Sequence, residues 1–261
     1  MKKLNVTAVS YLNTKPLLYG LLRSGLEEQI NLQLDIPSAC ARKLVSGEVD
    51  LGLIPVAAIP QLKQPHLISN FCIGTDGAVQ TVSIFSEVPI REVEHIYLDY
   101  HSRTSVALTR LLLRDHWKLT PELWPASPGY EARIQGKTAG LVIGDRAIGL
   151  EKHYPFVYDL GVEWKKHTGL PFVFAAWVSN QPLPADFVRA FNEALAEGIR
   201  AIPHLMFLLP TPQPDFDLQA YFTQNIQYDL DIPKKKALSI FLNELQGHLQ
   251  PSLREGLAEV L

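Results

Sequence analysis

Hydroxyl, amide and ammonium groups gather in the segment Ser10–Pro16, which joins a short apolar stretch to a helical pattern. Tyr11, Asn13 and Thr14 lie beside the expected start of that helix, and the free backbone amides of a helix N-terminus favour anions. We therefore predict that these three residues help to bind a small anion. The residues alone equally allow a helix cap with a packed tyrosine.

A second polar cluster, Asp99–Ser105, follows a strand pattern and begins the next helical pattern. Ser102, Thr104 and Ser105 place three hydroxyls within four positions, so that together with backbone amides they can bind a carboxylate. Arg103 can add a charge-assisted hydrogen bond. An ordinary cap formed by one hydroxyl is the alternative, but three hydroxyls favour a binding site.

A third candidate, Gly144 with Asp145, follows the apolar pattern Gly140–Ile143. Glycine lets a ligand approach the backbone closely. Asp145, at the carboxyl end of this expected strand, would face the cleft where the ligand binds, and it can accept a proton there if its pKa is raised. A turn with a surface ion pair to Arg146 is nearly as well supported.

Composition excludes several classes of protein. The chain has 261 residues, 47% of them hydrophobic, and a net charge of −3, which indicates a globular protein without a nucleic-acid or membrane partner. Cys40, Cys72 and the eight histidines show no metal-ligand spacing, so we expect no metal site. Polar residues interrupt the N-terminal apolar stretch, so we expect a cytoplasmic protein, either a monomer or a weak homodimer.

Strand and helix patterns alternate along the first part of the chain, which indicates parallel strands joined by helical crossovers. The expected strands are Leu4–Val9, Ile30–Ile36, Val49–Ile54, Val79–Phe85, His95–Leu98, Gly140–Ile143 and Phe172–Val178. The expected helices are Leu17–Leu22, Ala39–Val45, Thr104–Trp117, Ala185–Ile202, Phe216–Gln227, Pro233–Leu249 and a short last helix. Because ligands bind at the carboxyl ends of such strands, Pro55–Ala57 should lie near the Tyr11–Thr14 turn.

We predict an α/β fold of two lobes, each a mixed, mostly parallel sheet flanked by helices. Residues 1–86 and 172–261 are expected to form lobe 1, and residues 87–171 lobe 2. Two crossings, near Phe85–Val88 and Leu170–Phe174, would make a hinge that closes on a ligand. The residues alone leave open whether this binder of a small anion is a carrier or an enzyme.

The order and spacing of a series of sequence blocks resemble the chorismate dehydratases of the futalosine route to menaquinone. The blocks are Val9–Leu17, Leu53–Ala57, Gly77–Val82, Phe85–Ile90, Asp99 with Ser102–Leu108, Ile143–Ala147, Tyr158–Gly161 with Glu163–Trp164, and Thr168–Ala175. Ala78 and Thr81 stand where that family often has proline and serine, and Thr81 retains the hydroxyl.

The resemblance implies a type II periplasmic-binding-protein-like fold. It also implies loss of water from chorismate, giving 3-[(1-carboxyvinyl)oxy]benzoate, with no metal or organic cofactor. Asn13 and Thr81 would be the catalytic positions, and Pro55 and Val79 would join the substrate-binding set. The Ser102–Ser105 helix start would take one carboxylate of chorismate, and the Tyr11–Thr14 turn the other.

The catalytic base stays open. Asn13 and Thr81 are poor bases, so we expect them to orient the substrate and to polarise the leaving hydroxyl. Either Asp145 or the enolpyruvyl carboxylate of the substrate would take the proton. The alternative functions are a solute-binding protein of the same fold, the sister 1,4-dihydroxy-6-naphthoate synthase, and a ligand-sensing regulatory domain.

Overall fold

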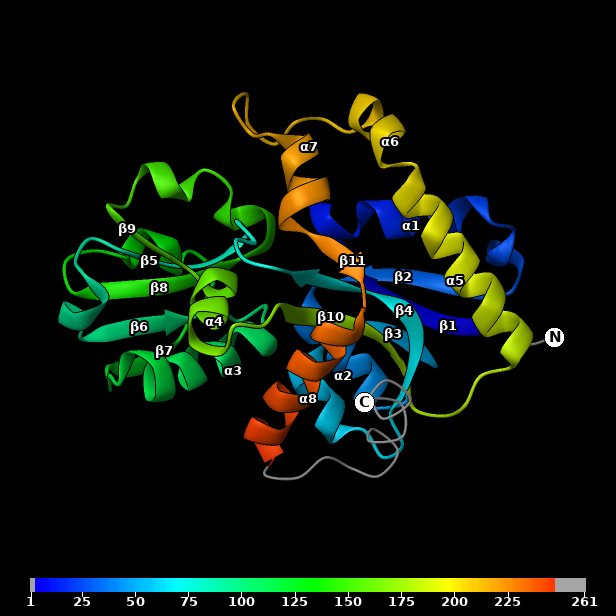
Figure 1. Ribbon diagram of the computed structural model, residues 1–261, viewed down its shortest axis with the longest axis horizontal. Coiled ribbons are helices and arrows are strands. Elements are labelled where there is room, and N and C mark those ends of the chain that lie inside the picture. The colour runs from blue at the N-terminus through cyan, green and yellow to red at the C-terminus, as the bar shows by residue number, and fades with distance from the viewer. Residues whose placement is uncertain (1–2, 247–261) are drawn as a thin grey trace.

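Two β-sheets form the framework of the molecule, one in each of two lobes that lie side by side (Figure 1). The structure is a computed structural model that describes residues 3–246. The first sheet, in the order β11-β4-β10-β3-β1-β2, contains β1 (Leu4–Val9), β2 (Ile30–Asp35), β3 (Leu51–Pro55), β4 (His66–Thr75), β10 (Phe172–Ser179) and β11 (Gln227–Asp229). The second sheet, in the order β7-β6-β8-β5-β9, contains β5 (Val82–Ser86), β6 (His95–Leu98), β7 (Glu122–Pro125), β8 (Thr138–Ile143) and β9 (Phe156–Asp159).

Helices cover both faces of the first sheet and flank the second (Figure 1). The α-helices are α1 (Lys15–Arg23), α2 (Pro37–Val45), α3 (Thr104–Leu111), α4 (Leu160–Thr168), α5 (Ala185–Arg200), α6 (Ile202–Leu208), α7 (Leu218–Ala220) and α8 (Ile232–Gln246). α3 and α7 continue into the π-helical turns η5 (Leu112–Trp117) and η9 (Tyr221–Asn225). The 3-10 helices are η1 (Leu12–Thr14), η2 (Leu26–Glu28), η3 (Val56–Gln61), η4 (Ile90–Glu92), η6 (Tyr130–Arg133), η7 (Gly144–Ala147) and η8 (Leu150–Lys152).

Two features of the sequence explain how the core of the first lobe is packed. Every residue of β3 and of β10 is buried, as expected for central strands covered on both faces. On one face, α1 and α5 pack at the closest possible distance, because Gly20 and Gly198 each meet the backbone of the facing helix and leave no room for a Cβ atom.

The predicted α/β architecture with two mixed sheets is confirmed, but the sheets are not mostly parallel. β1 is parallel to β2 and β3, whereas β10 is antiparallel to β3 and β4. In the second sheet β6 is parallel to β7 and β8, and β5 is antiparallel to β8 and β9. β5 and β10 run antiparallel because each enters its sheet from the other lobe, not through a helical crossover within one sheet.

The first crossing between the lobes lies earlier than predicted. Val82–Ser86 pairs with β8 and β9 of the second sheet, so the chain crosses between Thr75 and Val82, and the crossing expected near Phe85–Val88 is wrong. β10 begins at Phe172, inside the second expected crossing. The remaining lobe limits stay a prediction.

Two expected helices differ from the structure. The expected Phe216–Gln227 helix is present but shorter, because α7 and η9 span Leu218–Asn225 and the chain then extends as β11. The Pro233–Leu249 helix corresponds to α8, and the short last helix lies outside the described residues. Between residues 3 and 246, no helix has the length and apolar character needed to cross a bilayer.

Candidate active site

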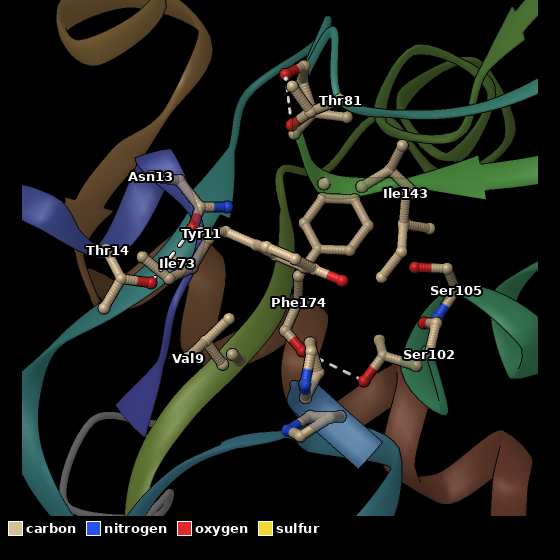
Figure 2. A pocket seen from close by; sticks show the side chains of 17 residues that line it. Val9, Tyr11, Asn13, Thr14, Ile73, Thr81, Ser102, Ser105, Ile143 and Phe174 are labelled. Atoms are coloured by element: carbon tan, nitrogen blue, oxygen red, sulfur yellow. Dashed lines mark hydrogen bonds between the residues drawn. The ribbon is translucent and has the colours of Figure 1, made fainter. Parts of the chain in front are cut away.

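A cavity lies between the two lobes, beside the carboxyl ends of β1, β3 and β8 (Figure 2). It encloses about 520 Å³ of space, its open mouth included. The predicted site residues that line it are Tyr11, Asn13, Thr14, Pro55, Val79, Thr81, Ser102, Thr104, Ser105 and Gly144. The other lining residues are Val9, Pro37, Ile73, Val82, Ile143, Phe174 and Ala175. Segments far apart in the sequence therefore meet around one cavity.

Asn13 is held so that its amide nitrogen is the group offered to the cavity (Figure 2). Thr14 Oγ1 donates to Asn13 Oδ1 at 3.1 Å. Because an amide accepts at its oxygen and donates at its nitrogen, Nδ2 is left to donate to a ligand. From behind, the Tyr228 hydroxyl donates to the Asn13 carbonyl oxygen at 2.8 Å. Asn13 is thus arranged as a hydrogen-bond donor, and Thr14 orients it.

Thr81 is fully buried and lies on the opposite side of the cavity from Ser102 (Figure 2). Its Oγ1 lies 3.0 Å from the Tyr221 hydroxyl and 3.5 Å from the Val79 carbonyl oxygen. Its own carbonyl oxygen accepts the Gly144 N–H at 2.8 Å. The Thr81 hydroxyl is therefore fixed by its own turn and by a tyrosine from a remote segment.

Asp159, which is not among the predicted site residues, holds the turn that precedes Thr81. One carboxylate oxygen accepts the Val79 and Gln80 N–H groups at 2.9 and 2.7 Å, and the other caps the start of α4. Gln80 needs this support because its φ of 64° lies in the left-handed region, which is costly for a residue other than glycine. Burial raises the pKa of Asp159, and its four N–H donors oppose that effect.

The start of α3 offers two available hydroxyls to the cavity, not three. Ser102 Oγ accepts the Ser105 N–H at 2.9 Å and keeps its own proton for a ligand, and Ser105 Oγ faces the cavity (Figure 2). The Thr104 hydroxyl instead donates to the Phe174 carbonyl at 3.0 Å and accepts the Ala57 N–H at 3.2 Å. Two hydroxyls at a helix N-terminus still favour a carboxylate.

Arg103 does not line the cavity, and the prediction that it binds the ligand is corrected. Its guanidinium donates to Gln61 Oε1 at 2.9 Å on an exposed surface. At the start of the helix, residues 102 and 105 face the cavity while residue 103 points away from it.

Asp145 is also absent from the cavity wall, because its carboxylate reaches across to the first lobe. The Leu12 N–H donates to its two oxygens, at 3.0 and 3.2 Å. The first amide of η1, expected to be free for an anion, is therefore occupied by a carboxylate of the protein. Burial raises the pKa of Asp145, while the Leu12 hydrogen bond and the charge of Lys15 lower it. Asp145 connects the lobes and does not face the cavity as a base.

Tyr11 makes a second connection between the lobes. Its hydroxyl lies 2.5 Å from Nδ1 of His101, and its ring packs against Gly144, whose φ is 67°. Burial raises the pKa of Tyr11 well above its ordinary value. Burial, followed by the charge of Arg146, lowers the pKa of His101, so its neutral ring can accept the Tyr11 proton in a hydrogen bond.

A buried ion pair supports this end of the cavity. Arg146 donates to both oxygens of Asp99, at 2.7 and 2.6 Å, and Asp99 is only 1% exposed. Asp99 also accepts the His101 N–H at 2.8 Å and the Ile143 N–H at 2.9 Å. Arg146, whose side chain is 28% exposed, thus pairs with the buried Asp99 and, at 2.7 Å, with the partly exposed Glu131, and it joins the ends of β6 and β8.

The polar side chains on the largely apolar cavity wall are all neutral. Among its described lining residues, no side chain is a carboxylate, an imidazole or an ammonium group, and the phenol of Tyr11 keeps its proton. Within the described part of the chain, no three His, Cys, Asp or Glu side chains are grouped so that they could hold a metal ion. The site can bind and polarise an anion, and the lining side chains supply no ready base.

Four supporting residues escaped the sequence analysis: Asp159, His101, Tyr221 and Tyr228. The two tyrosines had no local signal, since Tyr221 is 140 residues from Thr81 and Tyr228 is 215 residues from Asn13. His101 lies inside the Asp99–Ser105 cluster and Asp159 inside the Tyr158–Gly161 block, but neither was assigned a role in the site.

Comparison with known proteins agrees with this geometry. A family described as menaquinone biosynthesis matches residues 4–246. A chorismate dehydratase of Thermus thermophilus is 29% identical over 90% of this chain and 92% of its own, and one of Campylobacter jejuni is 24% identical over 90% and 94%. A Candida albicans gene product with the generic periplasmic binding protein fold superposes with a TM-score of 0.63, at 11% identity, over 100% of this chain and 96% of its own. Because the family match runs from β1 to the end of α8, across both lobes and the cavity between them, the chain belongs to the menaquinone biosynthesis family.

Proposed function

We propose that this protein is a chorismate dehydratase, a hydro-lyase that converts chorismate into 3-[(1-carboxyvinyl)oxy]benzoate and water. The observation that carries the proposal is the set of neutral donors, Asn13, Thr81, Ser102 and Ser105, around one cavity. Two relatives that span most of the chain bear the name of this enzyme. A cytoplasmic location and a monomer or weak homodimer remain predictions.

The ring carboxylate of chorismate is assigned to the start of α3. Ser102 and Ser105 can donate to it, and the helix dipole adds positive potential. When the C–H bond at the ether-bearing ring carbon breaks, its electron pair is delocalised through the ring double bond onto this carboxylate. Donors aimed there stabilise the developing charge and lower the barrier.

The enolpyruvyl carboxylate of the substrate is the proposed base. No carboxylate or imidazole lines the described cavity wall, and Asp145 is bound to Leu12. Asn13 Nδ2 is positioned to donate to an oxygen of the enolpyruvyl carboxylate, which directs the other oxygen toward the ring proton.

Thr81 is proposed to donate to the leaving hydroxyl. The ring carbanion expels hydroxide from the neighbouring carbon, a new double bond completes the aromatic ring, and the hydroxide combines with the abstracted proton as water. The contacts Asp145–Leu12 and Tyr11–His101 hold the lobes together around the reaction. Closure excludes bulk water from the charged intermediate.

The direct test is to incubate the purified protein with chorismate and to follow the aromatic product by absorbance and mass. Asn13→Ala and Thr81→Ala should each lower kcat at least about ten-fold, because each removes one donor. Arg103→Ala is the matched control, since that side chain faces away from the cavity. Near-normal turnover by both site variants would contradict the assignment. Tight binding of chorismate without conversion would favour a solute-binding protein.

A further inference from the structure

We infer that Tyr221 is a positioning residue, whose buried hydroxyl donates to Thr81 and thereby directs the Thr81 proton toward the substrate. The inference rests on the proposed dehydratase function, in which Thr81 donates to the leaving hydroxyl. The residues that line the cavity all come from positions 9–175, so Tyr221 would support the site from the C-terminal part of the chain, as Tyr228 does behind Asn13.

The position of Tyr221 depends on an irregular helix. Tyr221 begins the π-helical turn η9, which is closed by the Ile226 N–H donating to the Tyr221 carbonyl oxygen at 2.9 Å. Single π-helical turns are rare and occur often at functional sites. The ring packs against Phe216 with centroids 5.2 Å apart, and the residue is 0% exposed. Packing of the ring thus fixes where the hydroxyl lies.

The direction of the hydrogen bond follows from burial. A buried phenol needs an acceptor for its proton. Within residues 3–246, the acceptor for the Tyr221 hydroxyl is Thr81 Oγ1, which lies 3.0 Å away. Burial also raises the pKa of Tyr221 well above its ordinary value, so the phenol keeps its proton throughout the working pH range. Thr81 Oγ1 therefore accepts from Tyr221.

The proton of Thr81 is then free for the substrate. Its protein acceptor, the Val79 carbonyl, lies at 3.5 Å, which is the outer limit of a hydrogen bond. In the proposed reaction, the leaving hydroxyl of the substrate is the acceptor for this proton. Tyr221 thus leaves Thr81 one productive direction in which to donate, and donation from the phenol polarises the threonine hydroxyl further.

Tyr221→Phe tests this arrangement, because it removes the hydroxyl and keeps the ring. We expect kcat for chorismate to fall about ten-fold, the effect of one oriented hydrogen bond, with KM within about two-fold. Tyr158→Phe is the matched control: it removes a tyrosine hydroxyl that accepts the Ile90 N–H at 2.7 Å outside the cavity, and kcat should stay unchanged.

A double-mutant cycle separates positioning from a structural role. In a Thr81→Ser background, which keeps the acceptor, Tyr221→Phe should again cost about ten-fold in kcat. In a Thr81→Val background it should cost nothing more. An equal loss in both backgrounds, or an unchanged kcat for Tyr221→Phe, overturns the inference and leaves the dehydratase function standing. Absence of turnover by the unmodified protein overturns both.

Assays are run well below the thermal midpoint of each variant, so that loss of folding is not read as loss of catalysis. If Tyr221→Phe does not fold, 3-fluorotyrosine at position 221 keeps the ring and hydroxyl and changes the donor strength. An unchanged kcat in that protein overturns the inference, and a shifted kcat that requires the Thr81 hydroxyl supports it.

Discussion

Replacing Gly144 with alanine should disturb the contact between the lobes more than the fold of either lobe. Gly144 has a φ of 67°, and a Cβ built on it lies 2.5 to 2.8 Å from three ring atoms of Tyr11. Gly144 follows β8 of the second lobe, whereas Tyr11 follows β1 of the first. The clash can therefore be relieved by moving the lobes apart or by displacing the Tyr11 ring.

The free-energy cost of Gly144→Ala has two parts. Holding alanine in the left-handed region costs about 1–2 kcal/mol. Ordinary carbon–carbon contact needs about 3.5–4 Å, so the ring must move by about 1 Å. That displacement breaks the 2.5 Å hydrogen bond from Tyr11 to His101, at about 0.5–1.5 kcal/mol. Together these lower the free energy of unfolding by about 1.5–3.5 kcal/mol, of which only the second part falls on the closed state. Displacement of a cavity wall adds to the loss of kcat/KM, which we expect to fall about 10- to 100-fold.

Gly129→Ala is the matched control, because Gly129 has a φ of 83° in the same lobe and nothing lies within 4 Å of its added Cβ. In urea denaturation, Gly129→Ala should lower the free energy of unfolding only by the cost of a left-handed alanine, about 1–2 kcal/mol. Its kcat/KM should be normal. The Gly144→Ala protein should in addition have a larger radius of gyration by X-ray scattering. Equal kcat/KM for the two variants would refute the reasoning.

Three further predictions concern stability and pH. Gly20→Ala should lower the free energy of unfolding by about 2–3 kcal/mol in urea titrations, because the added Cβ clashes with the Ala194 carbonyl oxygen of α5. Asp159→Ala should lower it by about 2–4 kcal/mol and also lower kcat, because four backbone N–H groups lose their acceptor and the turn before Thr81 loosens. His101 has a pKa lowered by burial and by Arg146, so its contribution to stability is complete above the ordinary value of 6.5 and is lost as the pH falls through the lower folded pKa.

Each of these has a result that would count against it. An unchanged unfolding midpoint for Gly20→Ala would mean that α1 and α5 can separate at no cost. Asp159→Ala with a normal kcat would show that the cap of α4 does not position Thr81. The stability difference between pH 7.5 and pH 5 should shrink in His101→Asn, and an unchanged difference would exclude His101 as its source.

The elements with regular local patterns were predictable from the sequence. The alternation of Ile30–Asp35 and the periodicity of Thr104–Leu111 and Ala185–Arg200 each appear within one element, so no distant residue is needed to identify them. β4 and β11 were not predicted, because a strand of ten residues with an irregular pattern and one of three residues are both defined by their partners.

The candidate site was predictable where a polar residue follows a strand. Asn13 and Ser102 follow β1 and β6, and the sheet edge gathers them at the cavity. Thr81 lies inside the expected strand Val79–Phe85 and directly before β5, and only the family resemblance assigned it to the site. Arg103 and Asp145 were assigned to the cavity on the sheet-edge argument and do not line it. The argument locates a residue at the edge but says nothing of the direction of its side chain.

The sequence by itself therefore determined the family resemblance, the regular elements and the segments that surround the cavity, because these depend on residues close together in the chain. Only the tertiary structure decided that β5 belongs to the second sheet, that Asp145 binds Leu12, and that Tyr221 supports Thr81. Each of these is a choice of hydrogen-bond partner between segments far apart in sequence. Such choices depend on how the two lobes pack, and no local pattern records them.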